Sequence, residues 1–272
     1  MQKDGNEYEQ YVPNTSWGWN DEMHRIKLSN TSKVIKDIGA DIIGLQEIES
    51  ETALKELKAQ LNRDGLYYQY YAFAKKRNSA VAVGILSKYP INSALSHSVS
   101  QSRAYRDILE AKININGEIL HVFVNHWKSK SGPESMRIES AKVLKYLTAN
   151  LDDPFVILGD LNSDYEEYKT FVRSRKHNDT DGKTGINHIL KTIDEDEKPI
   201  TYATLRDNNT YLYNLWYDLE ASKRWSHEFR GQNEALDNII ISQKLIDEKG
   251  IEYVKGSFER FDASYLFYKN KP

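Results

Sequence analysis

The sequence contains no cysteine among its 272 residues, and only 6 prolines and 14 glycines. Without cysteine the chain can form neither disulfide bonds nor thiolate metal sites. No apolar run approaches the roughly 20 residues of a membrane-spanning helix. The first ten residues, Met1 to Gln10, are polar and lack the apolar core of a signal peptide. We therefore expect no membrane span, and a secreted or periplasmic location only if a signal peptide precedes Met1, with the cytoplasm as the alternative.

The chain also has little net charge: its 37 Lys and Arg residues nearly balance its 40 Asp and Glu residues, which leaves a net charge of −3. A passive DNA-coating protein would need a strongly basic surface, so that class is disfavoured, whereas an enzyme with a local basic groove is not. Hydrophobic residues at 39% and charged residues at 28% are ordinary for a globular protein. No internal repeat, low-complexity tract or Pro/Gly linker divides the chain. We predict a single domain over residues 1–272 that acts as a monomer.

The spacing of apolar residues predicts alternating helices and strands. Helices are expected from an N-cap at Asp21 to a stop at Gly39, and over residues 51–61 and 135–150. Strands are expected over residues 42–45, 67–74, 81–86, 109–115 and 119–125, from Phe155, and over residues 236–241. Asn116-Gly117 predicts a hairpin turn, and residues 164–217 are expected to form long loops. This order predicts an α/β (α+β) protein with a mixed sheet.

The segment Phe155-Val-Ile-Leu-Gly-Asp-Leu-Asn-Ser-Asp164 combines a buried strand with a polar exit. Four apolar residues predict the strand, a glycine lets the backbone turn, and Asp160 and Asn162 follow at alternate positions. Polar side chains at the carboxyl end of a buried strand are typical of sites in α/β sheets. A carboxylate and a carboxamide offer oxygen ligands to a hard cation such as Mg²⁺, and the amide can also donate to a phosphate. Taken alone, the segment is equally typical of an ordinary strand-to-turn exit.

Three further polar residues lie at strand ends. Glu47 closes Asp41-Ile-Ile-Gly-Leu-Gln-Glu47 and is a candidate cation ligand, although a surface acid is the commoner use of such a residue. His126 closes another strand and precedes Lys128, so its imidazole can bind or protonate a phosphate oxygen, with a structural histidine as the alternative. Asp237 lies at the amino end of the last strand, where an aspartate more commonly makes a structural hydrogen bond than takes part in a site.

Arginines and aromatic residues offer additional contacts. Ser102-Arg-Ala-Tyr-Arg-Asp107 carries two arginines suited to gripping a phosphate, although a solvated basic loop would have the same composition. His121 lies inside a strand and is interpreted as structural. The tryptophans can stack on bases, but core packing is the commoner use for most of them: Trp17, Trp19, Trp127, Trp216 and Trp225.

The order of the motifs is more specific than any single motif. Glu after a strand, Ser-Arg-x-Tyr-Arg, Asn-His-Trp-Lys-Ser-Lys, Gly-Asp-Leu-Asn and Leu-Asp-Asn-Ile-Ile follow one another between about Ile26 and Ser257. This order closely resembles the endonuclease/exonuclease/phosphatase superfamily, which includes DNase I-like nucleases, inositol polyphosphate phosphatases and bacterial sphingomyelinases. Residues 128–135 and 224–231 look most like the bacterial nuclease-like branch. The resemblance implies a DNase I-like four-layer sandwich of two packed mixed sheets flanked by helices.

The resemblance also implies phosphoester hydrolysis with Mg²⁺, or with Mn²⁺ or Ca²⁺. Glu47 would ligate the metal, and His126 would hydrogen-bond the scissile phosphate. Asp160 would orient or deprotonate the attacking water, and Asn162 would hold that water or a phosphate oxygen. Asp237 would support the metal and the histidine. These residue types suit the reaction, because phosphoryl transfer depends on charge neutralisation and in-line positioning more than on covalent chemistry.

The function that the resemblance favours is a nuclease that cleaves DNA, with Arg106, Asn125 and Lys128 as substrate contacts. One alternative is a phosphoesterase acting on inositol phosphates or phospholipids. Another, from a different class, is a catalytically inactive family member that serves as a binding domain.

Two features of the family are missing from the printed sequence. The family begins with a strand bearing an Asn near the metal, and Asn14 and Asn20 lie in no strand-like context. It also ends with Ser-Asp-His, whose histidine serves as acid and base, and the Asp-Ala-Ser at residues 262–264 is not a replacement. We therefore expect a domain that lacks the family's first strand and its C-terminal Ser-Asp-His strand.

Overall fold

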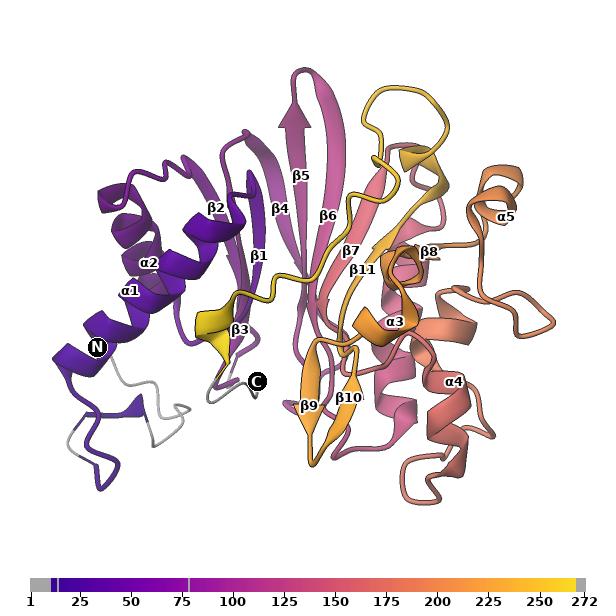
Figure 1. Cartoon of the computed structure of the whole chain (residues 1–272), viewed down its shortest axis with the longest axis horizontal. Coiled ribbons are helices and arrows are strands. Elements are labelled where there is room, and N and C mark those ends of the chain that lie inside the picture. The colour runs from indigo at the N-terminus through magenta and orange to yellow at the C-terminus, as the bar shows by residue number, and fades with distance from the viewer. Residues whose placement is uncertain (1–10, 14, 78, 268–272) are drawn as a thin grey trace.

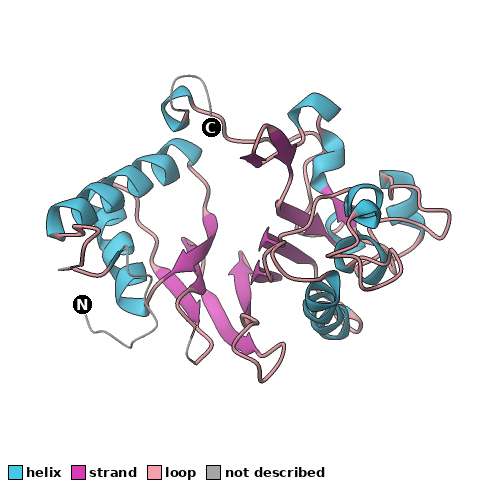
Figure 2. Cartoon of the chain, turned by 90° about the horizontal axis from the view of Figure 1, so that it is seen from below, coloured by secondary structure: helices cyan, strands magenta, loops and turns pink. Residues whose placement is uncertain are grey.

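The computed structural model describes residues 11–13, 15–77 and 79–267. Two β-sheets pack face to face, and helices cover the outer face of each sheet (Figures 1 and 2). The layers therefore run helix, sheet, sheet, helix, which confirms the four-layer sandwich. No helix within these ranges is long and apolar enough to cross a membrane.

The smaller sheet has three strands in the order β1 (Ile42–Ile48), β3 (Ala82–Ser87), β2 (Tyr70–Ala74). Both of its pairings are antiparallel, so the expectation of two mixed sheets is wrong for this one. A short loop joins β2 to β3, so these two strands run antiparallel. Strand β1 pairs with β3 instead of with β2, and this pairing is also antiparallel. Among the described strands, β3 is the only partner of β1.

The larger sheet has six strands within the described part of the chain. In spatial order they are β4 (Ile91–His97), β5 (Ile108–Ile115), β6 (Glu118–His126), β7 (Phe155–Asp160), β11 (Asp237–Ile241) and β8 (Tyr213–Asn214). Only β6 and β7 run parallel among these described strands, so this sheet is mixed as predicted. The β5–β6 hairpin turns at Asn116 and Gly117, whose φ angles of 56° and 102° are those that an Asn-Gly turn requires.

Two helices cover the smaller sheet. Helix α1 (Asp21–Ile38) is capped by Asn20, whose side chain accepts hydrogen bonds from the N–H groups of Glu22 and Met23, so the predicted cap at Asp21 is wrong by one residue. Helix α2 (Glu51–Arg63) packs beside it. The contact with the sheet is an apolar cluster of Ile35, Leu54, Leu57, Leu61, Tyr68 and Leu86.

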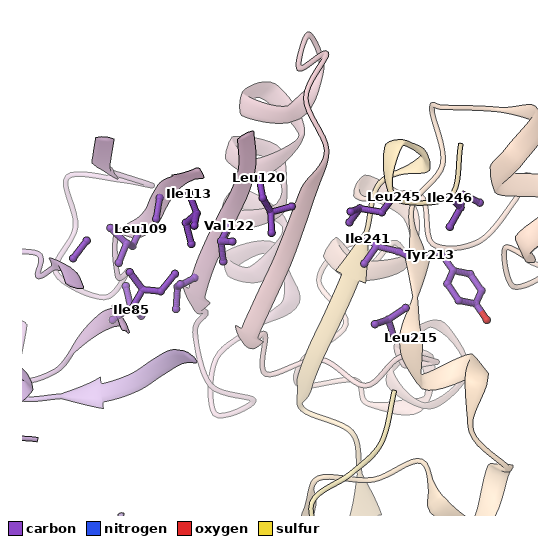
Figure 3. Packing of buried hydrophobic residues seen from close by; sticks show 14 of the residues in the cluster. Ile85, Leu109, Ile113, Leu120, Val122, Tyr213, Leu215, Ile241, Leu245 and Ile246 are labelled. Carbon is purple, nitrogen blue, oxygen red and sulfur yellow. The ribbon is translucent and has the colours of Figure 1, made fainter. Parts of the chain in front are cut away.

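The main core lies between the two sheets (Figure 3). It contains Ile85 of the smaller sheet, together with Leu109, Ile113 and Val122 of the larger sheet. At Gly44 the sheets approach so closely that a Cβ atom would overlap the Leu158 side chain. This close approach brings the end of β1 toward the ends of β6 and β7.

Helix α3 (Glu134–Thr148) connects β6 to β7 and covers the outer face of the larger sheet, where its Leu144 packs against Phe123 and Ile157. Residues 164–217, predicted to be loops, also carry short elements, α4 (Glu167–Thr170), α5 (Tyr202–Asp207) and β8. A small hairpin of β9 (His227–Phe229) and β10 (Gln232–Glu234) precedes β11.

Candidate active site

The parallel pair β6–β7 brings polar residues to one edge of the larger sheet. His126 is in register with Asp160, and Asp160 is in register with Asp237 of the antiparallel strand β11. Residues in register on adjacent strands present their side chains on the same face. His126, Asp160 and Asp237 therefore form a row across three strands, on the face that packs against the smaller sheet. Nε2 of His126 lies 3.5 Å from Oδ2 of Asp160.

The end of β1 faces this row because of an irregularity in its pairing. The register advances three residues on β1, from Leu45 to Ile48, but only two on β3, so β1 contains a bulge. Glu47 lies in the bulge with φ 57°. Glu47 therefore lies inside β1, whereas the sequence predicted that it follows the strand. Its side chain is exposed to solvent.

Gly159 connects β1 to the row. Its φ is 121°, and a Cβ atom would overlap the carbonyl oxygen of Asn125 and lie 2.8 Å from Nε2 of Gln46. The residue that precedes Asp160 at the end of β7 must therefore be glycine. The same contact places Gln46, and with it Glu47, beside the end of β7, where Asp160 lies.

The environment of Asp160 raises the pKa of its carboxyl group to about 6. Burial is the main cause, and the negative charges of Asp237 and Glu47 add to it. The backbone N–H of Asn162 donates to Oδ1 of Asp160 at 2.8 Å, and Arg106 lies near enough to oppose the rise. Three carboxylates and one guanidinium thus share a common electrostatic neighbourhood.

His126 is neutral at physiological pH. Burial, together with the nearby positive charge of Arg106, lowers its pKa to about 3. Its Nδ1 is buried without a hydrogen-bond partner. A neutral imidazole can donate one hydrogen bond to a phosphate oxygen, but it has no additional proton to give. The lowered pKa of His126 therefore favours the hydrogen-bonding role over protonation of the phosphate.

The carbonyl oxygen of Trp127 holds two of the predicted residues together. It accepts hydrogen bonds from Nη1 of Arg106 at 2.9 Å and from Nδ2 of Asn162 at 3.1 Å. Asn162 is buried and has φ 48°. Arg106 and Asn162 are thereby fixed beside His126 and Asp160.

The structure places Asn125 inside the core and Lys128 in the loop before α3. Asn125 is fully buried, and its amide donates to the carbonyls of Phe123 and Leu158 while Oδ1 accepts from Nε1 of Trp127. These bonds occupy the side chain inside the core, so it has no surface to offer a substrate. The Lys128 side chain folds over Gly132 in the loop before α3.

Two residues that support the site were not singled out from the sequence. Gln46 lies against Gly159, and its Nε2 is buried without a partner; its place beside Glu47 at a strand end was the available signal. Ser226 accepts the backbone N–H of Asp237 through Oγ at 3.1 Å, and no local pattern indicates this contact. Nε1 of Trp216 donates to the carbonyl oxygen of Asp237 at 2.8 Å, so the Asp237 backbone is fixed while its carboxylate stays exposed.

The arrangement defines a class of protein, an α/β sandwich with a carboxylate, histidine and arginine cluster at the edge of its two sheets. The profile of the endonuclease/exonuclease/phosphatase family matches residues 2–271. The chain belongs to this family, whose members are phosphoester hydrolases. No curated protein sequence matches it.

Solved structures share the fold at low sequence identity. A humanized Danio rerio TDP2 with 14 mutations has a TM-score of 0.56 and 14% identity, over 82% of this chain and 78% of that one. An endonuclease/exonuclease/phosphatase from Bacteroides vulgatus has a TM-score of 0.54 and 16% identity, over 87% and 84%. A mannosyl-6-phosphatase from Bacteroides thetaiotaomicron has a TM-score of 0.50 and 14% identity, over 80% and 77%. These likenesses establish the fold alone.

Proposed function

We propose that this protein is a divalent-metal-dependent phosphodiester hydrolase that cleaves DNA. The observation that carries the proposal is the row of His126, Asp160 and Asp237, joined by Glu47 and Arg106 in one electrostatic neighbourhood. Phosphoryl transfer requires such a combination of a proton acceptor, hydrogen-bond donors and balanced charge. Glu47 and Asp237 are solvent-exposed, so the cluster lies at an open edge that a continuous strand of DNA can cross.

The donor set fits a hard cation. Glu47 and Asp237 supply exposed carboxylate oxygens beside Asp160, and these are the ligands that Mg²⁺ prefers. Within the described residues, no three His, Asp or Glu side chains are grouped so that they could hold an ion by themselves. Mg²⁺ suits this arrangement, because it keeps several waters and takes phosphate oxygens as ligands. When bound, the ion would supply positive charge to the scissile phosphate.

The side chains around the phosphate position would each have a separate role. Asp160 accepts a proton from the attacking water, and a pKa of about 6 suits a general base near neutral pH. His126 donates a hydrogen bond from Nε2 to a phosphate oxygen. Arg106 and Asn162, both held by the Trp127 carbonyl, stabilise the charge on the phosphate as it grows.

Plasmid digestion tests the proposal directly. Supercoiled DNA is incubated with the protein in Mg²⁺, and the same reaction with EDTA serves as the control for metal dependence. We expect nicking in Mg²⁺ and none in EDTA. An inositol phosphate is tested in parallel, because release of phosphate from it without DNA cleavage would replace the nuclease with the alternative phosphoesterase. Inactivity on both substrates would favour the remaining alternative, a catalytically inactive family member that serves as a binding domain.

A further inference from the structure

A cavity of about 160 Å³ lies beside Glu47. It is formed where α1, the start of α2 and the segment before β3 meet the end of β1. Its walls include Trp19, Leu28, Leu57 and Val81, which are apolar. No residue of the row described above lines it, but Glu47 faces both the cavity and Asp160. The cavity is therefore adjacent to the proposed phosphate position and separate from it.

Aromatic rings organise one side of the cavity. The rings of Tyr11 and Trp19 meet edge to face with their centroids 5.1 Å apart, and the rings of Trp19 and His24 also meet edge to face, at 6.3 Å. Nζ of Lys27 lies 4.0 Å from the centroid of the Tyr11 ring. These contacts fix Trp19 in the wall of the cavity. Its indole presents a flat surface suited to stacking against a planar group.

The size and charge of the cavity restrict what it can bind. A cavity of about 150 Å³ with aliphatic and aromatic walls holds one benzene molecule, so this cavity matches a single six-membered ring. The lining carries both signs of charge, with carboxylates from Glu47 and Glu49 and an ammonium group from Lys27, so a neutral ring meets no excess of either sign. Thr31 adds a hydroxyl group that can meet the polar edge of a ring. A ligand with a neutral, one-ring aromatic group and a separate phosphate satisfies all three conditions.

We propose that this cavity binds the nucleobase next to the scissile phosphate, and that its size selects a pyrimidine over a purine. The inference rests on the proposed function, because it takes the phosphate to lie beside Glu47 and Asp160. The base enters the cavity unpaired, since a base pair has far more than one ring. The protein therefore prefers single-stranded DNA, or DNA with a displaced base, and has a sequence preference at one position.

Nucleotide binding tests the cavity without relying on cleavage. Isothermal titration in Mg²⁺ compares thymidine 5′-monophosphate, deoxyadenosine 5′-monophosphate and deoxyribose 5-phosphate, which lacks a base. We expect the thymidine nucleotide to bind at least about tenfold more tightly than the baseless phosphate, because burial of one ring is worth at least that factor. The adenosine nucleotide should bind more weakly than the thymidine nucleotide.

Three variants locate the effect. Trp19→Ala removes the stacking surface and Thr31→Trp fills the cavity, so each should abolish the preference for thymidine. Trp17→Ala is the matched control, because Trp17 is 62% exposed and does not line the cavity, and it should keep the preference. Thermal unfolding of each variant verifies that it is folded.

The outcomes separate this inference from the proposed function. Equal affinity for the thymidine nucleotide and the baseless phosphate, or no binding of either, would overturn the cavity as a base site. Preference retained in both Trp19→Ala and Thr31→Trp would do the same. Plasmid nicking without any base preference would contradict the base site but leave the proposed nuclease activity in place. A preference that Trp19→Ala abolishes, in a protein that nicks no DNA, would remove the nuclease and leave a nucleotide-binding site.

Discussion

Asp160 carries an electrostatic cost in the proposed site. Its carboxylate is buried beside two other carboxylates, Asp237 and Glu47, and its pKa rises to about 6. A carboxyl group whose pKa is higher in the folded protein than in the unfolded chain stabilises the fold at low pH. That stabilisation is lost as the pH rises from the unfolded value of about 3.9 through about 6. In the mechanism we propose, a general base at this position therefore costs the fold stability.

The variant Asp160→Asn should consequently be more stable and less active. The amide keeps an oxygen that accepts the Asn162 N–H but has no negative charge. We expect the free energy of unfolding to increase by about 1–2 kcal/mol at pH 7.5, with a smaller gain at pH 5, and DNA cleavage to fall about 10²–10³-fold. Urea denaturation at the two pH values measures the first effect. A gain that is larger at pH 5 would contradict the assigned pKa.

At the scale of secondary-structure elements, the site depends on backbone irregularities at strand ends. Glu47 in the bulge of β1, Gly159 near the end of β7 and Asn162 just beyond it have φ angles of 57°, 121° and 48°. Residues other than glycine reach this left-handed region at a cost of about 1 kcal/mol or more, which surrounding contacts must offset. These turns aim the side chains of two different sheets at one place.

Gly159→Ala should therefore be severely destabilising. An added Cβ is strained at φ 121° and overlaps the Asn125 carbonyl in the adjacent strand. We expect a loss of about 3 kcal/mol or more in the free energy of unfolding. Gly117→Ala is the matched control, because Gly117 also has a positive φ of 102° but no atom within 4 Å of the added Cβ. Its loss should be about 1 kcal/mol, and equal losses in the two variants would contradict the steric explanation.

A second polar cluster joins strands β4, β5 and β6 away from the site. The buried Glu110 carboxylate bonds to Nε2 of His97 at 2.7 Å and to Nδ1 of His121 at 2.8 Å, and Nε2 of His121 lies 3.4 Å from Oδ2 of Asp153. Burial alone would raise the pKa of Glu110, but the two histidines outweigh it and the pKa is lowered. His121 is thus a structural residue, as its place within a strand suggested.

Glu110→Gln should weaken this part of the sheet and change its response to acid. The lowered pKa means that the carboxylate stabilises the fold above the unfolded value of about 4.3, and that this contribution disappears as the pH falls toward the folded value. We expect a loss of about 2–3 kcal/mol at pH 7 and a shallower decline in stability below pH 5 than in the wild type. Urea denaturation between pH 3.5 and 7 measures both, and parallel declines for the two proteins would count against the pairing.

At the scale of the whole molecule, the sequence predicted the elements that have strong local signals. The apolar runs of β6 and β7 and the helix between them place His126 and Asp160 at one edge, because parallel strands end on the same side. Strand β4 was missed, since Ile91–His97 is mostly polar and exposed. The bulge at Glu47 depends on pairing with β3, and one hydrogen bond of Asn125 reaches the carbonyl of Leu158 in β7. Both partners are distant in sequence, so no local pattern indicates these two contacts.

We propose that the row across β6, β7 and β11 works as one phosphodiester-cleaving unit. A double-mutant cycle on plasmid nicking in Mg²⁺ is the sharpest test of this proposal. The variants are His126→Ala, Asp160→Ala and the combination, with His97→Gln as a histidine outside the site. We predict that each single substitution lowers the rate about 10²–10³-fold, that the double variant is little worse than either, and that His97→Gln stays near wild type. Wild-type protein that leaves the plasmid intact, single variants that cleave at the wild-type rate, or losses that multiply in the double variant would contradict the claim.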